Sequence, residues 1–407
     1  MKRNAFLTVS IAVVLLLAVT GNAHSQDWQQ FRGINRDCKV TGFITPVTWP
    51  SELKLVWKVT AGTGDATPVL VGKKIYLNTR QGDNEVILCF DATSGKELWK
   101  DTYPANAVTG PAGSHPGPRS TPAIANGKIV TYGASGILSC LDANTGKVLW
   151  RKDNPSNAVP QFFTAMSPLI VDGMCIAYVG MKDNGTILCL DIASGAEKWK
   201  WTGEGPAYSS PSIMQIDGKK HVILLSEKNI MALDFADGKI LWSIPTPLQP
   251  RFYNCVSPYI DGRIIYFSGQ GTGTKAIKVE KQGDNYVTKE LWTNATAGAK
   301  WNTPVLHDGF LYGFTDSRKI YCINATDGQT AWIDNATNSD FATLVDCGNV
   351  LIGLPSTSNL IIFKPDNKGY TEVARYKVSD TPIYSFPVVA VNAVYIKDAE
   401  SLMMYKF

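Results

Sequence analysis

One nine-residue phrase recurs five times in this chain and limits the folds available to it. The phrase is Asp, three residues, Gly, three further residues and Trp, with Asn in place of Asp in the last copy. Its copies lie at 91–99, 142–150, 191–199, 234–242 and 324–332, each after an apolar stretch. The Asp side chain can bond backbone groups two residues on, and the Gly supplies a positive φ. The phrase therefore predicts a β-hairpin turn with Trp on the returning strand.

A second phrase precedes each hairpin and consists of Ser/Thr-Pro, an apolar run, a turn and another apolar run. Examples begin at Thr67, Thr121 and Ser167. Proline is acceptable at the first residue of a strand because no ladder donor is lost there. The two phrases together give a four-stranded antiparallel unit. Successive Trp residues lie 40 to 51 residues apart, which is typical of the blades of a β-propeller.

The two ends of the chain predict how the ring of blades closes. Six complete blades occupy 67–100, 120–151, 167–201, 210–244, 257–293 and 303–333, and a degenerate seventh occupies 341–378. Residues 385–407 supply three strands, whereas 53–60 supply one strand without a hairpin partner. Joined, they complete one more blade and hide the last sheet edges. We therefore predict an all-β fold, an eight-bladed β-propeller of four-stranded antiparallel blades closed by the N-terminal strand.

The repeat Trp residues are predicted to be structural, because one per blade at a fixed position indicates packing between neighbouring blades. They are Trp57, Trp99, Trp150, Trp199, Trp242, Trp292 and Trp332, with Tyr376 near the corresponding place in the seventh blade. Cys89, Cys140, Cys189 and Cys322 each stand two residues before the Asp or Asn of the phrase. We expect these four to be reduced core residues. The state of Cys38, Cys175, Cys255 and Cys347 is less constrained.

The first 25 residues have the features of a secretory signal peptide. Lys2 and Arg3 precede an apolar run, and small residues end the segment at Ser25. The alternative, a membrane anchor, is disfavoured by the shortness of the run. We expect cleavage near Ser25, a lead-in segment at 26–52, a single propeller at 53–407 and no transmembrane span. The protein is then expected in the periplasm or outside the cell.

Composition excludes one class of partner. Lys plus Arg is 39 and Asp plus Glu is 35, a formal charge of +4. Such a balance argues against a nucleic-acid partner held by phosphate contacts. We expect a monomer.

The phrases at 141–150 and 190–199 resemble the tryptophan-docking repeat of propellers of the pyrroloquinoline-quinone (PQQ) type, and the resemblance covers 53–407. Quinoprotein dehydrogenases share this repeat with non-enzymatic propellers such as the BamB component of outer-membrane assembly. Residues 27–37 resemble the lead-in of exported BamB-like proteins.

For the dehydrogenases, the resemblance implies an Asp base, a Ca²⁺ ion and often adjacent cysteines near the quinone. No two cysteines are adjacent here, and neither the base nor the Ca²⁺ ligands can be assigned. The four His residues are not spaced as metal ligands, so we predict no metal site. Because the dehydrogenase residues cannot be assigned, we also predict no cofactor. The sequence favours an exported, non-enzymatic binding scaffold, with a PQQ-dependent alcohol or sugar dehydrogenase using Ca²⁺ as the alternative. A propeller that binds or hydrolyses polysaccharide is a weaker third hypothesis, because no carboxylate pair can be placed.

The candidate binding residues lie where each blade's first strand begins, because the repeats agree elsewhere and differ there. Counting three residues before each proline, and including close neighbours, selects large amphipathic or planar cationic side chains. They are Arg119, Tyr208, Arg251, Tyr253, Trp301 and Tyr384, with His115, Phe163, Lys300 and Asn302 near them. We expect an envelope or secreted protein or peptide as the partner, and expect the two arginines to recognise a carboxylate or phosphate. The alternative is that these are only loop residues around a water-filled channel.

Overall fold

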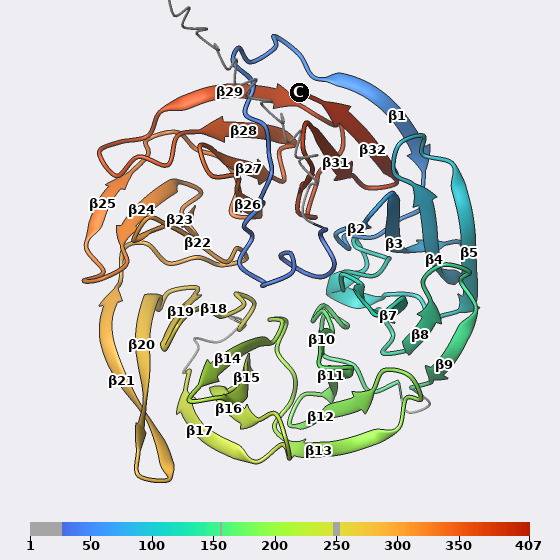
Figure 1. Cartoon of the computed structure of the whole chain (residues 1–407), viewed down its shortest axis with the longest axis vertical. Helices are drawn as coiled ribbons and strands as arrows, with labels where there is room; N and C mark the ends of the chain where they lie inside the picture. Colours follow the sequence, from blue (N-terminus) through green and yellow to red (C-terminus); the bar gives the residue numbers. More distant parts are fainter. Residues whose placement is uncertain (1–26, 155–156, 247–252) are drawn as a thin grey trace, which may run out of the picture.

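The computed structural model describes residues 27–154, 157–246 and 253–407. Within these ranges the strands form eight four-stranded antiparallel sheets, which follow one another around a ring (Figure 1). The predicted eight-bladed propeller is therefore confirmed. The predicted signal peptide lies outside the described residues. Within the described ranges no helix has the length and hydropathy needed to cross a bilayer.

The first four blades follow the chain in order. Blade 1 contains β2 (Val69–Val71), β3 (Lys74–Gln81), β4 (Asn84–Asp91) and β5 (Glu97–Pro104). Blade 2 contains β6 (Ala123–Ala125), β7 (Lys128–Tyr132), β8 (Leu138–Asp142) and β9 (Val148–Lys152), and a short 3-10 helix, η1 (Gly110–Ala112), precedes it. Blade 3 contains β10 (Leu169–Val171), β11 (Met174–Met181), β12 (Asn184–Asp191) and β13 (Glu197–Gly203). Blade 4 contains β14 (Ser212–Ile216), β15 (Lys219–Leu225), β16 (Asn229–Asp234) and β17 (Ile240–Pro245).

The remaining blades include one that joins the two ends of the chain. Blade 5 contains β18 (Tyr259–Asp261), β19 (Ile264–Gly269), β20 (Gly273–Gln282) and β21 (Asn285–Asn294). Blade 6 contains β22 (Val305–His307), β23 (Phe310–Phe314), β24 (Ile320–Asn324) and β25 (Thr330–Ile333). Blade 7 contains β26 (Ala342–Asp346), β27 (Leu351–Pro355), β28 (Asn359–Phe363) and β29 (Glu372–Lys377). Blade 8 contains β30 (Val388–Val389), β31 (Ala393–Lys397), β32 (Ser401–Lys406) and the N-terminal β1 (Lys54–Thr60).

Each repeat Trp docks on the turn of the next blade. The indole N–H of Trp99 donates to the carbonyl of Ala143 (3.1 Å), and its ring lies on Gly146. A Cβ on Gly146 would stand 2.6 Å from that ring, and the φ of this glycine is +74°. The turn therefore needs glycine both for its backbone conformation and for the space that the Trp occupies. Trp57, on β1, makes the same contact with blade 1 through the carbonyl of Ala92 (3.1 Å).

Two positions depart from this pattern. Blade 5 has a long β20–β21 hairpin in place of the phrase, and the buried Nε1 of Trp242 has no hydrogen-bond partner among the described residues. In blade 7 the register opposite Ile362 places Ala374, not Tyr376, at the Trp position. The Tyr376 hydroxyl instead donates to the carbonyl of Pro50 (2.9 Å). This tyrosine therefore fastens the lead-in segment to the ring.

A belt of hydrogen bonds around the channel explains the Ser/Thr before each proline. The N–H of Thr121 donates to Oγ of Ser167 (3.0 Å), whose own N–H donates to Oγ of Ser210 (2.9 Å). The pattern continues through Ser257 to Thr303, and Phe386 N–H donates to Oγ1 of Thr67 across the join between blades 8 and 1. The hydroxyls of Thr67, Ser167, Ser210, Ser257 and Thr303 thus each link two neighbouring blades.

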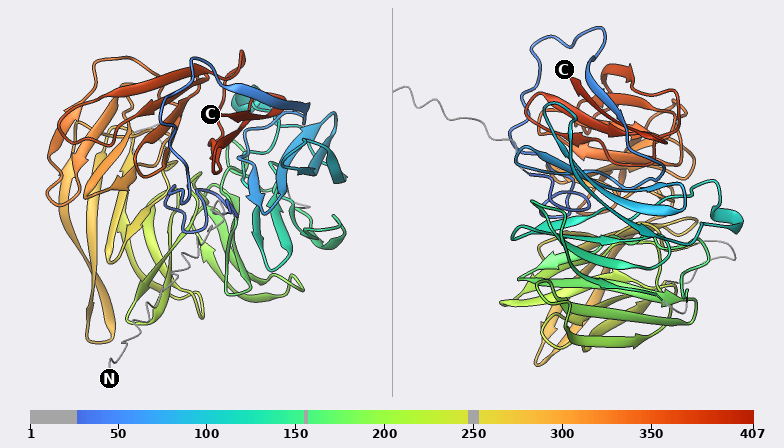
Figure 2. Two further views of the ribbon diagram at one scale, coloured as in Figure 1. Left: turned by 45° about the horizontal axis from the view of Figure 1, so that its top comes forward. Right: turned by 90° about the vertical axis from the view of Figure 1, so that its right-hand side faces the viewer.

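The lead-in segment, in blue, reaches the centre of the ring (Figures 1 and 2). Arg36 is buried there and donates to the carbonyls of Pro168 and Pro211, the latter at 2.7 Å. Arg32, also buried, donates to the carbonyl of Pro304 (3.3 Å). Val40 N–H donates to the carbonyl of Asp346 (2.8 Å). The lead-in segment therefore binds blades 3, 4, 6 and 7 from inside the ring.

All eight cysteines are free thiols. The four repeat cysteines are buried, and each pairs across the sheet with its repeat Trp, as Cys89 does with Trp99. Of the others, Cys255 is half-buried and the rest are buried.

We predict that β1 is required for a closed ring. Replacing 53–60 by a Gly/Ser segment of equal length keeps the lead-in segment tethered but removes the strand that pairs with β32. The exposed edge should cause aggregation or a large loss of thermal stability. Size-exclusion chromatography and thermal unfolding beside the parent protein measure this, and a variant as soluble and heat-stable as the parent would contradict it.

We also predict that the indole hydrogen bond has a measurable effect. Trp99→Phe should lower the free energy of unfolding by about 1 kcal/mol more than Trp242→Phe, because only Trp99 has an acceptor to lose. Denaturant unfolding of the two variants provides the comparison. Equal losses would show that packing alone holds the blades together.

Candidate functional site

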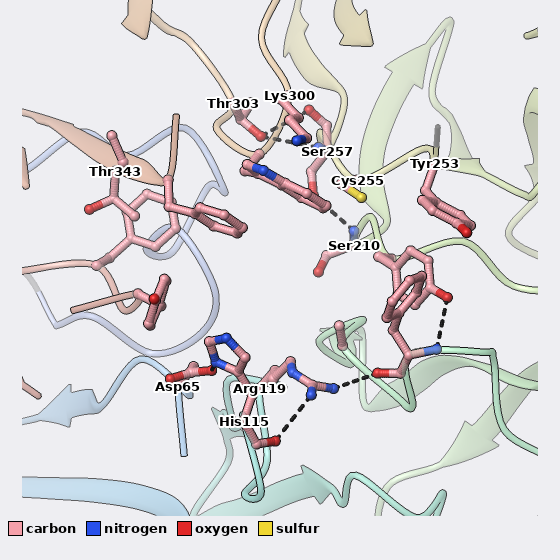
Figure 3. Close-up of a pocket in the computed structure, with 18 of the residues that line it drawn as sticks. Asp65, His115, Arg119, Ser210, Tyr253, Cys255, Ser257, Lys300, Thr303 and Thr343 are labelled. Carbon is pink, nitrogen blue, oxygen red and sulfur yellow. Dashed lines mark hydrogen bonds and ion pairs between the residues drawn. The ribbon is translucent and has the colours of Figure 1, made fainter. Parts of the chain in front are cut away.

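A cavity of about 640 Å³ lies at one mouth of the central channel (Figure 3). The loops that enter the blades surround it, and each contributes a side chain to its wall. Going around the ring from blade 1 to blade 8, these are Asp65, His115, Phe162, Tyr208, Tyr253, Trp301, Phe341 and Tyr384. Phe31 of the lead-in segment also lines the cavity and packs edge-on against Phe386 (ring centroids 5.5 Å apart).

The first aromatic arc, as we call it, consists of Phe162, Tyr208 and Tyr253. All three rings meet edge to face, with centroids 5.1 to 5.9 Å apart. The Phe162 N–H donates to the Tyr208 hydroxyl (3.1 Å), and the Tyr253 hydroxyl donates to Oε1 of Gln161 (3.2 Å). These contacts hold the rings of blades 3, 4 and 5 in one group.

The second aromatic arc consists of Trp301, Phe341, Tyr384 and His115. Trp301 stacks on Phe341 with centroids 4.8 Å apart and planes 10° from parallel. Tyr384 meets Phe341 edge-on at 5.4 Å, and His115 meets Tyr384 edge-on at 4.7 Å. The second arc therefore runs from blade 6 through blades 7 and 8 to the loop that enters blade 2.

Polar groups occupy both ends of the second arc. Nδ1 of His115 lies 2.6 Å from a carboxylate oxygen of Asp65. At the Trp301 end, Nζ of Lys300 lies 5.1 Å from the Trp301 ring centroid and 3.7 Å from a carboxylate oxygen of Asp340. All four side chains are only partly exposed, so their polar groups are held in position by their neighbours.

Arg119 joins the two arcs. Its Nη1 donates to the carbonyl of Phe162 (2.5 Å), and its Nη2 donates to the carbonyls of Ala112 (3.4 Å) and His115 (3.1 Å). Burial lowers the pKa of Arg119, an effect that the charge of Asp65 opposes. The guanidinium is thus committed to backbone carbonyls, which differs from the expected bidentate contact with a ligand carboxylate or phosphate.

The structure brings together most of the residues selected from sequence. Arg119, Tyr208, Tyr253, Trp301 and Tyr384 all line the cavity, as do His115 and Lys300. Arg251 lies outside the described residues. Phe163 packs with Val108, Ala112 and Ala134, and Asn302 bonds the backbone of Phe314, so these two support the wall from behind.

Sequence reasoning missed four aromatic residues of the cavity. They are Phe31, Phe162, Phe341 and Phe386. Phe162 stands too far before Pro168 for a count of three, and blade 7 has no proline from which to count toward Phe341. An aromatic residue in each of the loops that enter blades 3 to 8 was the signal that could have found Phe162 and Phe341.

Burial keeps two groups of the wall, the Cys255 thiol and the Tyr208 phenol, protonated at neutral pH. Burial raises the pKa of the Cys255 thiol, and Lys300 opposes this only in part. Burial also raises the pKa of the Tyr208 phenol. Neither group is therefore prepared to act as a nucleophile.

Comparison with known proteins identifies the family. The family described as outer membrane protein assembly factor BamB matches residues 83–334. The chain belongs to this BamB family. BamB of Yersinia pestis is 25% identical over 248 residues, which cover 57% of this chain and 60% of that protein. The matched segment thus spans less than two thirds of that relative.

Solved structures share the fold at low sequence identity. BamB from Moraxella catarrhalis superposes with a TM-score of 0.65 at 16% identity, over 87% of this chain and 98% of that one. Quinohemoprotein alcohol dehydrogenase from Comamonas testosteroni superposes with a TM-score of 0.71 at 14% identity, over 93% of this chain and 80% of that one. The fold of this BamB-family chain is thus shared by an assembly factor and by a dehydrogenase.

The cavity of this BamB-family propeller fits PQQ with Ca²⁺ poorly. Of the described residues that line it, Asp65 alone carries a carboxylate, and His115 already binds it. Elsewhere in the described ranges no three His, Cys, Asp or Glu side chains gather as a metal site. Ca²⁺ takes six to eight oxygen ligands. The cations that could bind the quinone's carboxylates, Arg119 and Lys300, are held by carbonyls and by Asp340.

We predict that Arg119→Ala destabilises the wall of the cavity. Removing the charged donor to three carbonyls should lower the free energy of unfolding by about 2 kcal/mol. Arg375→Ala, which removes an arginine paired with Glu372 on the outer strand β29, is the control and should cost less than about 1 kcal/mol. Denaturant unfolding of both variants and of the parent protein measures these free energies of unfolding. If Arg119→Ala is as stable as the parent, the carbonyl contacts contribute little, and the hypothesis that the Arg119 guanidinium is available to bind a ligand is favoured instead.

Proposed function

We propose that this protein is an exported, non-enzymatic binding propeller that holds a segment of an envelope or secreted protein in the cavity at the channel mouth. The observation that carries the proposal is the convergence of one side chain from every blade, most of them aromatic, on a single cavity. Large amphipathic aromatic side chains dominate the energetics of binding sites, because they bury much area and still offer a polar group.

The shape of the site supports capture rather than chemistry. The wall consists of two groups of rings, and within each group the rings are already packed against one another. Binding of a partner therefore costs little additional side-chain conformational entropy. Burial keeps the Cys255 thiol and the Tyr208 phenol protonated, and the carboxylate of Asp65 is bound to a histidine. Membership of the BamB family agrees with a role in assembly of envelope proteins as one form of this function.

A PQQ-dependent alcohol or sugar dehydrogenase is the second candidate. It is favoured by the fold shared with the Comamonas testosteroni enzyme and by the presence of a carboxylate, Asp65, in the cavity. Reconstitution with PQQ and Ca²⁺, followed by absorbance and a dye-linked assay, separates the candidates. Quinone binding with turnover would replace the scaffold proposal.

We predict that partner capture depends on the aromatic arcs. A photo-crosslinking residue at position 253 should form a discrete adduct with an exported protein, whereas the same residue at position 98, an exposed leucine on the outer strand β5, should not. In the protein without the photo-crosslinking residue, the double substitution Trp301→Ala, Tyr384→Ala should weaken binding of the identified partner at least about 30-fold. This is the effect expected from the loss of a side chain that contributes strongly to the binding free energy. The control is Leu98→Ala with Leu149→Ala, which removes two exposed outer-strand side chains.

Two results would contradict this proposal. The first is adduct formation at position 98 but not at position 253. The second is full-strength binding by the Trp301→Ala, Tyr384→Ala variant with its fold intact.

A further inference from the structure

We propose that the cavity recognises a phenolic ring, whose hydroxyl donates a hydrogen bond to Nε2 of His115 while the ring packs against the two aromatic arcs. This inference rests on the proposed binding function and names the chemical group that the cavity selects. The juxtaposition that carries it is an Asp–His pair at the end of an aromatic wall.

The carboxylate of Asp65 fixes the tautomer of His115. A carboxylate only accepts hydrogen bonds, so Nδ1, 2.6 Å from it, must carry the proton. In the neutral imidazole the other nitrogen is then an acceptor. Among the described residues no hydrogen bond joins Nε2 of His115 to a protein atom. The cavity therefore presents one oriented acceptor to a guest.

Several further contacts hold the His115 ring in place. The backbone N–H of His115 donates to the carbonyl of Ala112 (2.9 Å), and the backbone carbonyl of His115 accepts a hydrogen bond from Arg119 (3.1 Å). The ring meets Tyr384 edge-on at 4.7 Å. Backbone, carboxylate and neighbouring ring together fix the direction of the acceptor before any guest arrives, which is how a binding site gains specificity.

The body of the cavity suits an aromatic guest. Tyr253 and His115 lie on different sides of an open centre (Figure 3), so a ring between them meets both arcs. Aromatic rings pair favourably edge to face, which is the arrangement that the first arc already shows. A volume of about 640 Å³ lies within the usual range of small-ligand sites.

A polyhydroxylated guest such as a sugar fits less well. Ser210, Ser257 and Thr303 line the cavity, but each of these hydroxyls already accepts a backbone N–H of the preceding blade. Thr303 Oγ1 also donates to the carbonyl of Ser257 (3.2 Å). Because the oxygens of these hydroxyls already accept hydrogen bonds of the belt, they offer few acceptors to the donors of a sugar, and a guest with one donor and a large apolar face matches the cavity better.

The test is a titration of the mature protein with three probes of nearly the same shape. p-Cresol offers a phenolic donor, 4-methylanisole replaces the donor by a methyl ether, and toluene has neither. Calorimetry should show p-cresol binding about tenfold more tightly than either analogue, the worth of one hydrogen bond. Equal binding of p-cresol and 4-methylanisole, or no binding of p-cresol at millimolar concentration, would overturn the inference.

Two variants examine the role of the tautomer. In Asp65→Asn the amide can donate to Nδ1, which moves the imidazole proton to Nε2 and turns the acceptor into a donor. The oxygens of p-cresol and 4-methylanisole can both accept from it, so the preference should fall to within about twofold. His115→Phe keeps a ring against Tyr384 without the acceptor, and should bind p-cresol and toluene alike. A tenfold preference for p-cresol that survives both substitutions would contradict the proposal.

Tyr253→Phe is the matched control, because it keeps the ring of the first arc and removes only a hydroxyl bound to Gln161. It should retain the tenfold preference. Thermal unfolding of each variant separates loss of selectivity from loss of fold, since a purely structural Asp65–His115 pair would change stability without changing the ratio of affinities.

The source of the phenol is resolved by a last comparison. If the ring belongs to a tyrosine of a bound segment, the peptide Gly-Tyr-Gly should bind more tightly than p-cresol, and Gly-Phe-Gly should bind about tenfold more weakly than Gly-Tyr-Gly. If it belongs to a free phenol, p-cresol should bind better than either peptide. Partner adducts at position 253 without any phenol preference would leave the binding function standing and remove this inference alone.

Discussion

The docking of a Trp on the glycine turn of the next blade is the contact on which the ring depends. Trp99 covers Gly146, and the same pairing joins Trp150 to Gly195, Trp199 to Gly238 and Trp292 to Gly328. The indole supplies buried area, and in most copies its N–H satisfies a turn carbonyl, so packing and hydrogen bonding act at one point. Because the donor is on one blade and the glycine on the next, each blade is completed by its neighbour. This dependence favours closure over an open array.

Two inner systems give the ring a defined centre. The hydroxyl belt joins the segments that enter neighbouring blades, and the lead-in segment reaches the centre of the ring, where Arg32 and Arg36 donate to proline carbonyls. Buried guanidinium groups require several acceptors. Arg36 bonds two proline carbonyls and Oε1 of Gln30, whereas Arg32 bonds one proline carbonyl and Sγ of Cys38. The loops at the mouth surround a cavity, and Phe31 of the lead-in segment is part of its wall.

The fold could be predicted from sequence because the residues that make its main contacts recur at fixed spacings. These spacings predicted the hairpins, and the unmatched strand with Trp57 predicted ring closure. The residues of the cavity were more difficult to predict. The count that located Tyr208 and Trp301 passed over Phe162 and Phe341, whose offsets differ between loops. The role of Arg119 depends on carbonyls of two loops that no local pattern brings together. Likewise, the belt hydroxyls act across blades, so their Ser/Thr-Pro phrase was interpreted only as the start of a strand.

Completion of blade 8 by β1 has a consequence for how the chain folds. Lys54 pairs with Lys406, and the amide of Phe386 bonds the hydroxyl of Thr67, so contacts that span more than 300 residues complete the ring. Until β32 has formed, β1 has no partner, and Trp57, though able to dock on blade 1, belongs to no sheet. Contacts of such sequence separation slow folding, because a long loop must close before they form. Formation of β32 therefore governs when β1 becomes protected, and the polypeptide remains vulnerable to proteases and to strand exchange until these two strands pair.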